Sequence, residues 1–556
     1  MKNIFSTYLS QLNPTVGKVS YNFKLVRESW QKAKEIQADL LVTTELITSG
    51  YPPDDLLLRP SFIIEIEKEV KSLIEFTRSQ GPAIILGTPW FRDGKLYNAS
   101  IVIDKGKIIG ESLKNNLPNY GVFDEKRFFA SSNSNSLINI KGVNCGVLIC
   151  EDMWTEDVCK SLKNQGAELL IVINASPFDI KKIAERENIA SQRVKETELP
   201  LIYVNQVGGQ DELVFDGNSF ILNNKAKKVL SLPSWESNDK LLTWKIGSKR
   251  NLSYESEIHN VTKNTSQEIY SALVLGLRDY INKNNFKGVI VGMSGGIDSA
   301  LTASIATDAL GSDKVRCIMM PSIYTSDESL RDAKECSDLL QVNYSVINIK
   351  GVLKEYKSIF NNIFNGLEED ETEENIQSRV RGAILMAISN KFGDMVLATG
   401  NKSEMSVGYA TLYGDMCGGF SVLKDVYKTV VFSLAEWRNT NFLNFFKGKQ
   451  GCMIPKNIIK KPPTAELKPN QFDHDKLPSY DVLDAILIAL IEEEKSLDNI
   501  INLGYEKKIV EQVAKLLKIA EYKRRQSPPG IKITNKSFGR ERRYPITNQF
   551  IEKVLE

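Results

Sequence analysis

Ser294-Gly295-Gly296-Ile297-Asp298-Ser299 is the stretch that decides the fold of the half of the chain around it. The apolar run 288–292 precedes it and predicts a buried strand. Residues 300–310 are small and aliphatic and end at Gly311, which predicts a helix. The stretch is therefore a tight turn from strand to helix. Backbone N–H groups in such a turn, together with the helix dipole, favour an anion.

The residue types in this turn favour phosphate binding, although a lone Gly-Gly pair would favour a structural turn. The glycines allow an anion to approach the backbone, the serine hydroxyls add donors, and Asp298 can hold a magnesium ion that phosphates share. No Gly-Lys-Ser/Thr follows, so the turn is not a Walker A loop. The positive charge that neutralises the phosphates must therefore come from a metal ion or from a distant Lys or Arg.

The same alternation continues outward from the turn. Strands are expected at 315–320, 343–349 and 395–398, helices at 327–341 and 376–391, and a mobile acidic loop at 366–374. This order predicts an α/β domain with a doubly wound parallel sheet and right-handed crossovers.

Polar segments follow three of these strands and should meet where nucleotides bind in such sheets. They are 294–299, 321–326 and 399–404. The last segment supplies Thr399 as a donor and Glu404 as a second carboxylate. Asp298 and Glu404 together could complete a magnesium site.

The hexapeptide resembles the pyrophosphate-binding loop of the ATP pyrophosphatases, which include NAD, GMP and asparagine synthetases. Other segments resemble the NAD synthetases in particular: Asn375-x-Gln377-x-Arg379-x-Arg381, 399–404, Gly-Tyr-x-Thr-Leu-Tyr-Gly-Asp at 408–415, Ala465-Glu466-Leu467 and Gln526-x-Pro528-Pro529-Gly530. The resemblance implies an ATP-pyrophosphatase domain that adenylates the nicotinate carboxylate of deamido-NAD, after which ammonia displaces AMP.

The resemblance also implies the residues that bind each substrate. The ATP contacts are Gly292, Met293, Ser294, Gly295, Gly296, Ile297, Asp298, Ser299 and Thr399. The deamido-NAD contacts are Asn375, Glu404, Tyr409, Ala410, Thr411, Leu412, Asp415 and Lys523. The basic runs at 521–526 and 538–543 are either a solvated face or the cations that neutralise the phosphates.

Residues 1–247 form a second α/β region, with short apolar runs separated by helical patterns. Glu45 and Cys150 each come just after an apolar run, where α/β folds place chemistry. By itself Cys150 could be a core thiol, which is the commonest fate of a free cysteine. Cys145 lies five residues earlier on the same predicted strand, so it should face the opposite way, and we assign it to the core. By spacing alone, Glu45 and Lys114 are more typical of surface charges.

These three segments resemble the Glu-Lys-Cys triad of the nitrilase superfamily. The resemblance implies an αββα sandwich that hydrolyses glutamine, with Glu45 as general base, Lys114 as oxyanion stabiliser and Cys150 as nucleophile. Glu125 resembles the glutamate that supports the lysine, and Thr44 departs from the usual proline. Three further residues resemble glutamine contacts: Tyr120, Ser176 and Lys182. A nitrilase-like domain fused to a synthetase matches the glutamine-dependent NAD synthetases.

Composition narrows the possible chemistry and location. The chain has 556 residues and a formal charge of +2, so two to four domains and no nucleic-acid partner are expected. The polar stretch 248–264 predicts a linker between domains 1–247 and 265–556. Seven scattered cysteines and the lack of a signal peptide or membrane span predict a cytoplasmic protein. A homo-oligomer is expected from the family.

The two histidines, His259 and His474, help to separate the rival functions. A Cys-His-Glu glutaminase, as in GMP synthetases with the same ATP loop, would need one of them, and His259 falls in the predicted linker. A rival of another class is a nucleotide-binding sensor with a degenerate synthetase half. The intact loop and Glu404 disfavour it.

Overall fold

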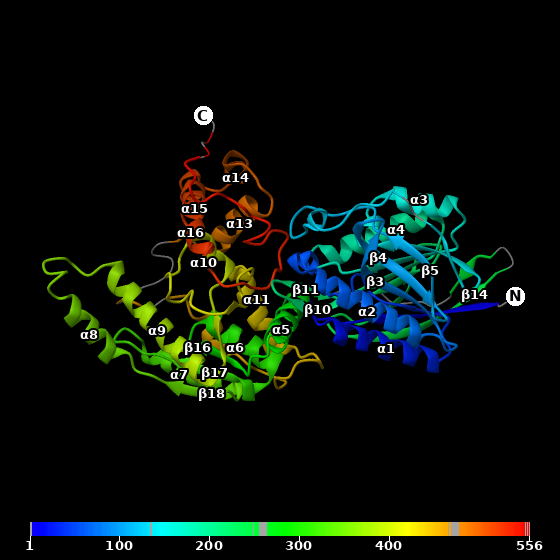
Figure 1. Ribbon diagram of the computed structural model, residues 1–556. Helices are drawn as coiled ribbons and strands as arrows, with labels where there is room; N and C mark the ends of the chain where they lie inside the picture. Colours follow the sequence, from blue (N-terminus) through cyan, green and yellow to red (C-terminus); the bar gives the residue numbers. More distant parts are fainter. Residues whose placement is uncertain are drawn as a thin grey trace. The chain divides into compact units, whose positions relative to one another are not determined.

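The computed structural model describes residues 3–133, 136–247, 250–254, 264–464, 466–468 and 477–550, with 552 and 554 (Figure 1). The chain separates into two compact units, Met1–Thr262 and Lys263–Glu556, which are described one at a time. Part of the predicted linker is instead a strand of the first unit, because Leu252–Ser253 pairs with the preceding strand. His259 and His474 lie outside the described residues.

Two mixed sheets form the centre of the first unit. One has the order β15-β14-β1-β2-β3-β4-β5, with β1 Ile4–Gln11, β2 Leu40–Val42, β3 Ala83–Arg92, β4 Lys95–Asp104, β5 Lys107–Leu113, β14 Asn238–Ile246 and β15 Leu252–Ser253. The other has the order β13-β12-β9-β8-β7-β6, with β6 Ile138–Ile140, β7 Val143–Ile149, β8 Leu169–Asn174, β9 Leu201–Asn205, β12 Phe220–Leu222 and β13 Lys228–Ser231. A separate hairpin joins β10 Val207–Gln210 to β11 Leu213–Asp216.

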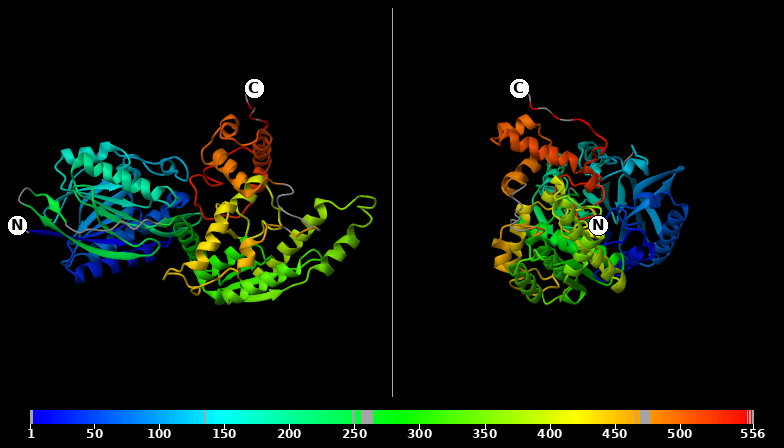
Figure 2. Two further views of the ribbon diagram at one scale, coloured as in Figure 1. Left: turned by 180° about the vertical axis from the view of Figure 1, so that it is seen from behind. Right: turned by 90° about the vertical axis from the view of Figure 1, so that its left-hand side faces the viewer.

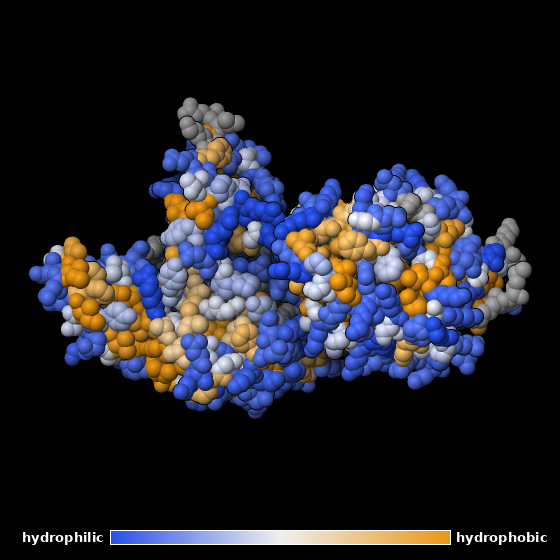
Figure 3. Space-filling model, viewed as in Figure 1, coloured by the Kyte–Doolittle hydropathy of each residue, from blue (hydrophilic) through white to orange (hydrophobic). Residues whose placement is uncertain are grey.

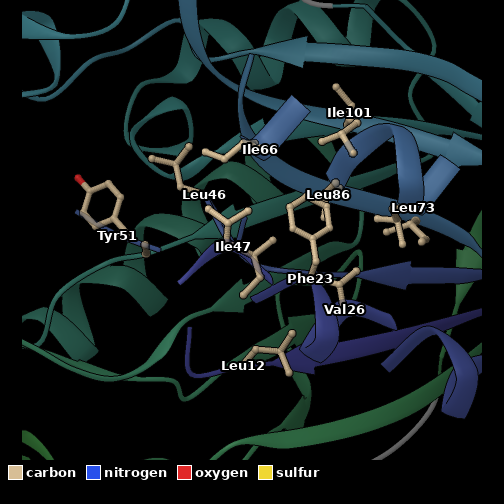
Figure 4. Packing of buried hydrophobic residues seen from close by; sticks show 14 of the residues in the cluster. Leu12, Phe23, Val26, Leu46, Ile47, Tyr51, Ile66, Leu73, Leu86 and Ile101 are labelled. Atoms are coloured by element: carbon tan, nitrogen blue, oxygen red, sulfur yellow. The ribbon is translucent and has the colours of Figure 1, made fainter. Parts of the chain in front are cut away.

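Helices cover the outer face of each sheet, which confirms the αββα sandwich. Helices α1 Val19–Glu35 and α2 Pro60–Phe76 lie over the first sheet, and α3 Glu156–Asn164 and α4 Lys182–Thr197 over the second (Figure 2). Figure 4 shows the packing below α1 and α2, where Phe23 and Val26 meet Leu86 of β3. A third apolar cluster fills the space between the sheets.

The first sheet brings the two ends of this unit together. β1 pairs antiparallel with β14, from Ile4 opposite Lys245 to Gln11 opposite Asn238, and parallel with β2 on its other edge. The sheet therefore forms only when β14, near the end of this unit, pairs with β1 at its beginning.

The second unit has a five-stranded, wholly parallel sheet in the order β18-β17-β16-β19-β20. Its strands are β16 Val289–Gly292, β17 Val315–Met319, β18 Asn343–Val346, β19 Met395–Ala398 and β20 Phe420–Ser421. From β16 the chain adds β17 and β18 on one side and then β19 and β20 on the other, which confirms the doubly wound sheet. The switch point, where such folds bind nucleotides, lies between β16 and β19.

The helices of this unit fall into two groups. Those along the sheet are α5 Thr265–Lys283, α6 Ile297–Leu310, α7 Asp327–Leu340, α8 Lys350–Phe360, α9 Glu371–Phe392 and α11 Lys428–Thr440, with the short α12 Lys456–Lys460. The others are α10 Lys402–Val407, α13 Tyr480–Ile491, α14 Leu497–Asn502, α15 Lys507–Ile519 and α16 Glu521–Arg524. Residues of α10, α13, α14 and α15 share one apolar cluster.

Three element boundaries of this unit differ from the sequence predictions by three residues or more. The helix after the phosphate turn begins at Ile297, inside the hexapeptide, and β18 ends at Val346. The acidic segment 366–374 is not wholly a loop, because Asp370 caps α9 and Glu373 returns a bond to the Asp370 backbone. That reciprocal capping box turns Glu371 to Glu374 into the first turn of α9.

Candidate active sites

Cys150 lies in a sharp turn directly after β7. Along β7, Cys145, Val147 and Ile149 face the space between the sheets, while Leu148 faces α3 and α4. Cys150 would face outward if the strand continued, but it has a left-handed φ of 45° and begins a 3₁₀ turn. Its side chain therefore packs with the inter-sheet cluster that also contains Cys145, and the expected opposition of the two cysteines is wrong. A left-handed non-glycine residue is strained, and such strain is typical of functional turns.

The predicted lysine and glutamates form one buried cluster. Lys114 Nζ donates to Glu45 Oε1 at 2.7 Å and to Glu125 Oε1 at 2.8 Å. Asn98 Nδ2 donates to Glu45 Oε1 at 2.8 Å, and the Tyr51 hydroxyl donates to Glu125 Oε1 at 2.9 Å. Lys114 and Glu45 are fully buried. Neither is the surface charge that spacing alone suggested.

Electrostatics fix the resting protonation of this cluster. Burial and the Glu45 carboxylate raise the pKa of Cys150 well above its ordinary value, although Lys114 acts to lower it. Burial alone would lower the pKa of Lys114, but Glu125 and Glu45 outweigh it and raise that pKa. The cluster therefore contains a neutral thiol beside a permanent ammonium.

Asp152 connects the lysine segment to the cysteine turn. Its Oδ1 accepts from the backbone N–H groups of Asn115 and Asn116 at 3.0 and 2.8 Å, and its Oδ2 accepts from Ile149 N at 3.2 Å. Burial raises the pKa of Asp152 to about 7. Sequence reasoning missed this residue, although it stands two positions after Cys150.

Two of the three predicted glutamine contacts, Tyr120 and Lys182, act on Glu151, a carboxylate that was not predicted to take part. Tyr120 donates its hydroxyl to Glu151 Oε1 at 2.9 Å. Lys182 lies 4.2 Å above the Trp154 ring. Burial raises the pKa of Glu151, and the Lys182 charge acts in the opposite direction without cancelling that increase. Ser176 is buried, and the preceding N–H, of Ala175, donates to Glu45. The carboxylate directly after Cys150 in the chain thus has the Lys182 ammonium within electrostatic reach.

The phosphate turn of the second unit has the predicted strand–turn–helix form. Gly295 has a left-handed φ of 81°, and a Cβ there would lie 2.5 Å from the carbonyl oxygen of Ser329 on α7. Ser294 N and Oγ bond Ser299 Oγ at 3.2 and 3.1 Å. Only glycine fits this close approach of the turn to α7.

A cleft of about 290 Å³ opens over this turn. All the predicted ATP contacts line it, as do the deamido-NAD candidates Glu404, Tyr409 and Asp415. It also receives Arg381, Lys428 and Lys461. No residue of the basic runs 521–526 and 538–543 is among its described lining, so the option that these runs neutralise the phosphates is not supported. Arg524 instead caps carbonyls of α10 and pairs with Glu521.

Lys428 joins the two predicted metal ligands. Its ammonium contacts Asp298 Oδ2 and lies 3.2 Å from Glu404 Oε1. Asn401 Nδ2 donates to Asp298 Oδ1 at 2.9 Å. The two carboxylates are thus within reach of one cation, although no group of three or more His, Cys, Asp or Glu among the described residues could hold a metal. Two carboxylates plus substrate phosphates are a typical Mg²⁺ environment, so the pair fits magnesium.

Three further deamido-NAD candidates, Asn375, Thr411 and Lys523, hold the loop 408–415 beside the cleft, whereas the Leu412 carbonyl accepts from Arg379 Nε at 3.2 Å. Thr411 Oγ1 donates to Asn375 Oδ1 at 2.8 Å, and Thr411 N donates to Asp415 Oδ1 at 2.6 Å. Lys523 Nζ donates to the carbonyls of Gly408 and Ala410 at 2.8 and 2.7 Å. Asn375 and Lys523 are 148 positions apart in the chain, and together they hold the loop 408–415 in place.

Comparison with known proteins gives the class of each unit. Residues 9–249 match the carbon–nitrogen hydrolase family and residues 269–527 match the NAD synthase family. The protein is therefore a carbon–nitrogen hydrolase fold joined to an NAD synthase fold.

Full-length relatives narrow this class. Glutamine-dependent NAD(+) synthetases of Acinetobacter baylyi and Thermotoga maritima are 43% and 41% identical, and the matches cover 98% of this chain and 98% and 99% of theirs. A solved glutamine-dependent NAD+ synthetase of Acinetobacter baumannii is 41% identical with a TM-score of 0.78, over 99% of this chain and all of that one. The chain belongs to the glutamine-dependent NAD(+) synthetases.

Proposed function

We propose that this protein converts deamido-NAD, ATP and glutamine into NAD, AMP, pyrophosphate and glutamate. The observation that supports this most strongly is a buried cysteine, lysine and glutamate cluster in one unit of a chain whose other unit has a phosphate turn at the switch point of a parallel sheet. We assign glutamine hydrolysis to 1–247 and NAD formation to 265–556, joined by 248–264.

In the first unit, the cluster supports amide hydrolysis through a thioester. Glu45 takes the Cys150 thiol proton as sulfur attacks the carboxamide carbon, and the Lys114 ammonium stabilises the resulting oxyanion. The C–N bond then breaks, and Glu45 returns the proton to the departing ammonia. A water molecule, deprotonated by Glu45, attacks the thioester and releases glutamate. Glu125 keeps Lys114 charged and oriented through their 2.8 Å contact.

The charges of Glu151 and Lys182 match those of an amino acid. A free glutamine carries an ammonium and a carboxylate on its α-carbon, and Glu151 and Lys182 supply the complementary pair. Tyr120 fixes Glu151 through its 2.9 Å hydrogen bond, and Ser176 lies next to the Ala175 N–H that orients Glu45.

In the second unit, the cleft supports adenylation. The backbone of the turn 294–299 binds phosphate oxygens, and Thr399 adds a donor. Asp298 and Glu404 would hold Mg²⁺, which supplies positive charge to the phosphates at transfer. The loop fixed by Asn375, Asp415 and Lys523 orients the nicotinate carboxylate of deamido-NAD toward ATP.

One experiment tests this function against its rivals. The purified protein is incubated with ATP, glutamine and Mg²⁺, together with deamido-NAD in one reaction and xanthosine monophosphate in a parallel one, and the products are identified by mass spectrometry. We expect NAD, AMP, pyrophosphate and glutamate. A product from xanthosine monophosphate instead would favour a GMP synthetase-like enzyme, and nucleotide binding without any product would favour a sensor.

We also propose a cytoplasmic homo-oligomer. All seven cysteines are free thiols, and among the described residues no helix has the length and apolarity of a membrane span. Exposed apolar side chains gather over α8 and the adjoining α9 (Figure 3), including Ile359, Ile363 and Leu367 at 67%, 72% and 73% exposure. A face of this kind is typical of a subunit interface. Light scattering after size-exclusion chromatography tests it, with Ile359→Glu expected to lower the mass.

A further inference from the structure

The phosphate turn lacks a lysine of its own, so the cation that serves it must come from elsewhere in the fold. Arg381, Lys428 and Lys461 line the described part of the cleft. The Lys428 ammonium lies between Asp298 and Glu404, and Arg381 Nε donates to the Met320 carbonyl at 3.1 Å. The phosphate turn packs against one wall of the cleft, and Lys461 is the cation among these three whose side chain contacts that wall.

That wall is the beginning of α7. Lys461 Nζ donates to Ser329 Oγ at 2.6 Å, and the carbonyl oxygen of Ser329 is the atom that excludes a Cβ from Gly295. Three carboxylates surround the ammonium at longer range: Glu466 at 3.7 Å, Asp332 at 3.9 Å and Glu328 at 4.0 Å. Lys461 is thus two contacts away from the phosphate turn, and its side chain is only 15% exposed.

Glu466 is bound in this place as an external anion would be. Its Oε1 accepts from Ser326 Oγ at 2.7 Å and from Ser329 Oγ at 2.8 Å, and its Oε2 accepts from Ser326 N at 3.3 Å. Two hydroxyls, a backbone N–H at a helix start and a nearby ammonium are the donors that phosphate oxygens take. Glu466 itself has a left-handed φ of 48°.

We propose that Lys461, with Ser326 and Ser329, is a subsite for the polyphosphate of ATP and the pyrophosphate released from it. Glu466 competes with phosphate for the same donors. Binding of phosphate moves the Glu466 carboxylate away, and its return helps to expel pyrophosphate. The inference rests on the proposed function, because it assigns these residues to the ATP cleft of the synthetase reaction.

Two variants distinguish this subsite from a structural ion pair, because a subsite predicts that they change pyrophosphate binding in opposite directions. Lys461→Met removes the charge and keeps the length of the side chain, whereas Glu466→Gln removes the competing charge and keeps the shape. Lys460→Met is the matched control, because Lys460 is adjacent, exposed and outside the cleft. The full-length protein is used throughout, and calorimetry with magnesium pyrophosphate measures binding directly. The KM for ATP is measured with ammonium chloride as the nitrogen donor.

We expect Lys461→Met to weaken pyrophosphate binding and raise the KM for ATP, each by about 10-fold or more, as for loss of a charged hydrogen bond. We expect Glu466→Gln to tighten pyrophosphate binding several-fold, with the control unchanged. Equal weakening in both variants would make Glu466 a structural partner of α7 and overturn the proposal, as would unchanged binding in Lys461→Met. Calorimetry needs no turnover, so wild-type protein that binds pyrophosphate but makes no NAD would contradict the proposed function alone.

Discussion

Cys150 shares its buried surroundings with two glutamates and one lysine, and this balance of charge determines how its thiol reacts. Its pKa is raised by burial first and by Glu45 second, with Lys114 acting in the opposite direction. A thiol whose pKa lies well above 9 is protonated at neutral pH and reacts slowly with electrophiles. If Cys150 is the nucleophile that we propose, its thiol must be activated when substrate binds, by transfer of its proton to Glu45.

Glu45→Gln should separate thiol acidity from catalysis. Removal of the carboxylate removes a cause that raises the pKa of Cys150, so that pKa should fall and alkylation by iodoacetamide at pH 8 should become faster. Glutamine hydrolysis should fall by roughly 10² to 10⁴, because the general base is lost. Peptide mapping must follow Cys150 separately, since Cys452 is exposed. Fast alkylation of wild-type Cys150 at neutral pH would contradict this description of the site.

Asp298→Asn and Glu404→Gln should each abolish NAD formation with either glutamine or ammonia. Each removes one carboxylate from the pair bridged by Lys428, and the adenylation transition state needs the metal charge that we assign to them. Asp313→Asn is the control, because Asp313 is an exposed carboxylate just after α6. Activity is measured across a magnesium titration, and near-normal ammonia-dependent turnover in both variants would remove the metal assignment.

At the scale of elements, the phosphate turn depends on how closely β16, α6 and α7 approach one another. Gly295→Ala forces a left-handed φ of 81° on a side chain and places its Cβ 2.5 Å from Ser329 O. We expect a loss of about 1–3 kcal/mol in unfolding free energy and a raised KM for ATP. Thermal unfolding and ATP kinetics measure the two effects.

Gly351→Ala is the contrasting variant for this test. Gly351 lies in α8, and a Cβ there meets nothing within 4 Å. It should gain up to about 1 kcal/mol from helix propensity without a change in KM. If Gly295→Ala behaved like Gly351→Ala, the close packing of the turn against α7 would be required neither for stability nor for ATP binding.

Most elements around this turn could be predicted because their signals are local. The run before the turn and the small residues after it identify β16 and α6. The Asp370-x-x-Glu373 capping box that starts α9 is an equally local signal, but we predicted a loop there. By contrast, β20 has only two residues and carries no periodic signal. α11, and with it Lys428, therefore could not be assigned to the cleft.

Candidate site residues were predictable where a motif carried them and not where the fold alone brought them together. Glu45, Lys114 and Cys150 stood in segments with a family resemblance, and the structure gathers them. The left-handed φ of Cys150 leaves no trace in residue type. The contact between Lys461 and Ser329 joins positions 132 apart, and spacing along a chain says nothing about such pairs.

At the scale of the molecule, two compact units predict two separable chemistries. Cys150→Ala should make no NAD from glutamine but should keep substantial synthesis from ammonium salts at high pH, because every described residue that lines the proposed ATP cleft belongs to the second unit. NAD production is measured with each nitrogen donor. Loss of the ammonia reaction in a folded Cys150→Ala protein would show that the sites are not separable.

Cys145→Ala is the matched control for this prediction. Cys145 packs in the same inter-sheet cluster but lies on β7, where its thiol donates to the Val143 carbonyl at 3.7 Å. It should keep both activities and lose roughly 1 kcal/mol of stability. Normal use of glutamine by Cys150→Ala would make Cys150 a core thiol like Cys145.

The pairing of β1 with β14 also sets a condition on biosynthesis. β1 ends at Gln11 and leaves the ribosome first, whereas its antiparallel partner ends at Ile246. At typical translation speeds the interval between them lasts roughly 10 to 50 s. Throughout that time one edge of β1 presents unpaired backbone groups, on which strands of other nascent chains can pair. We therefore expect ribosomes that pause before residue 238 to prolong an aggregation-prone intermediate and to lower the yield of folded protein.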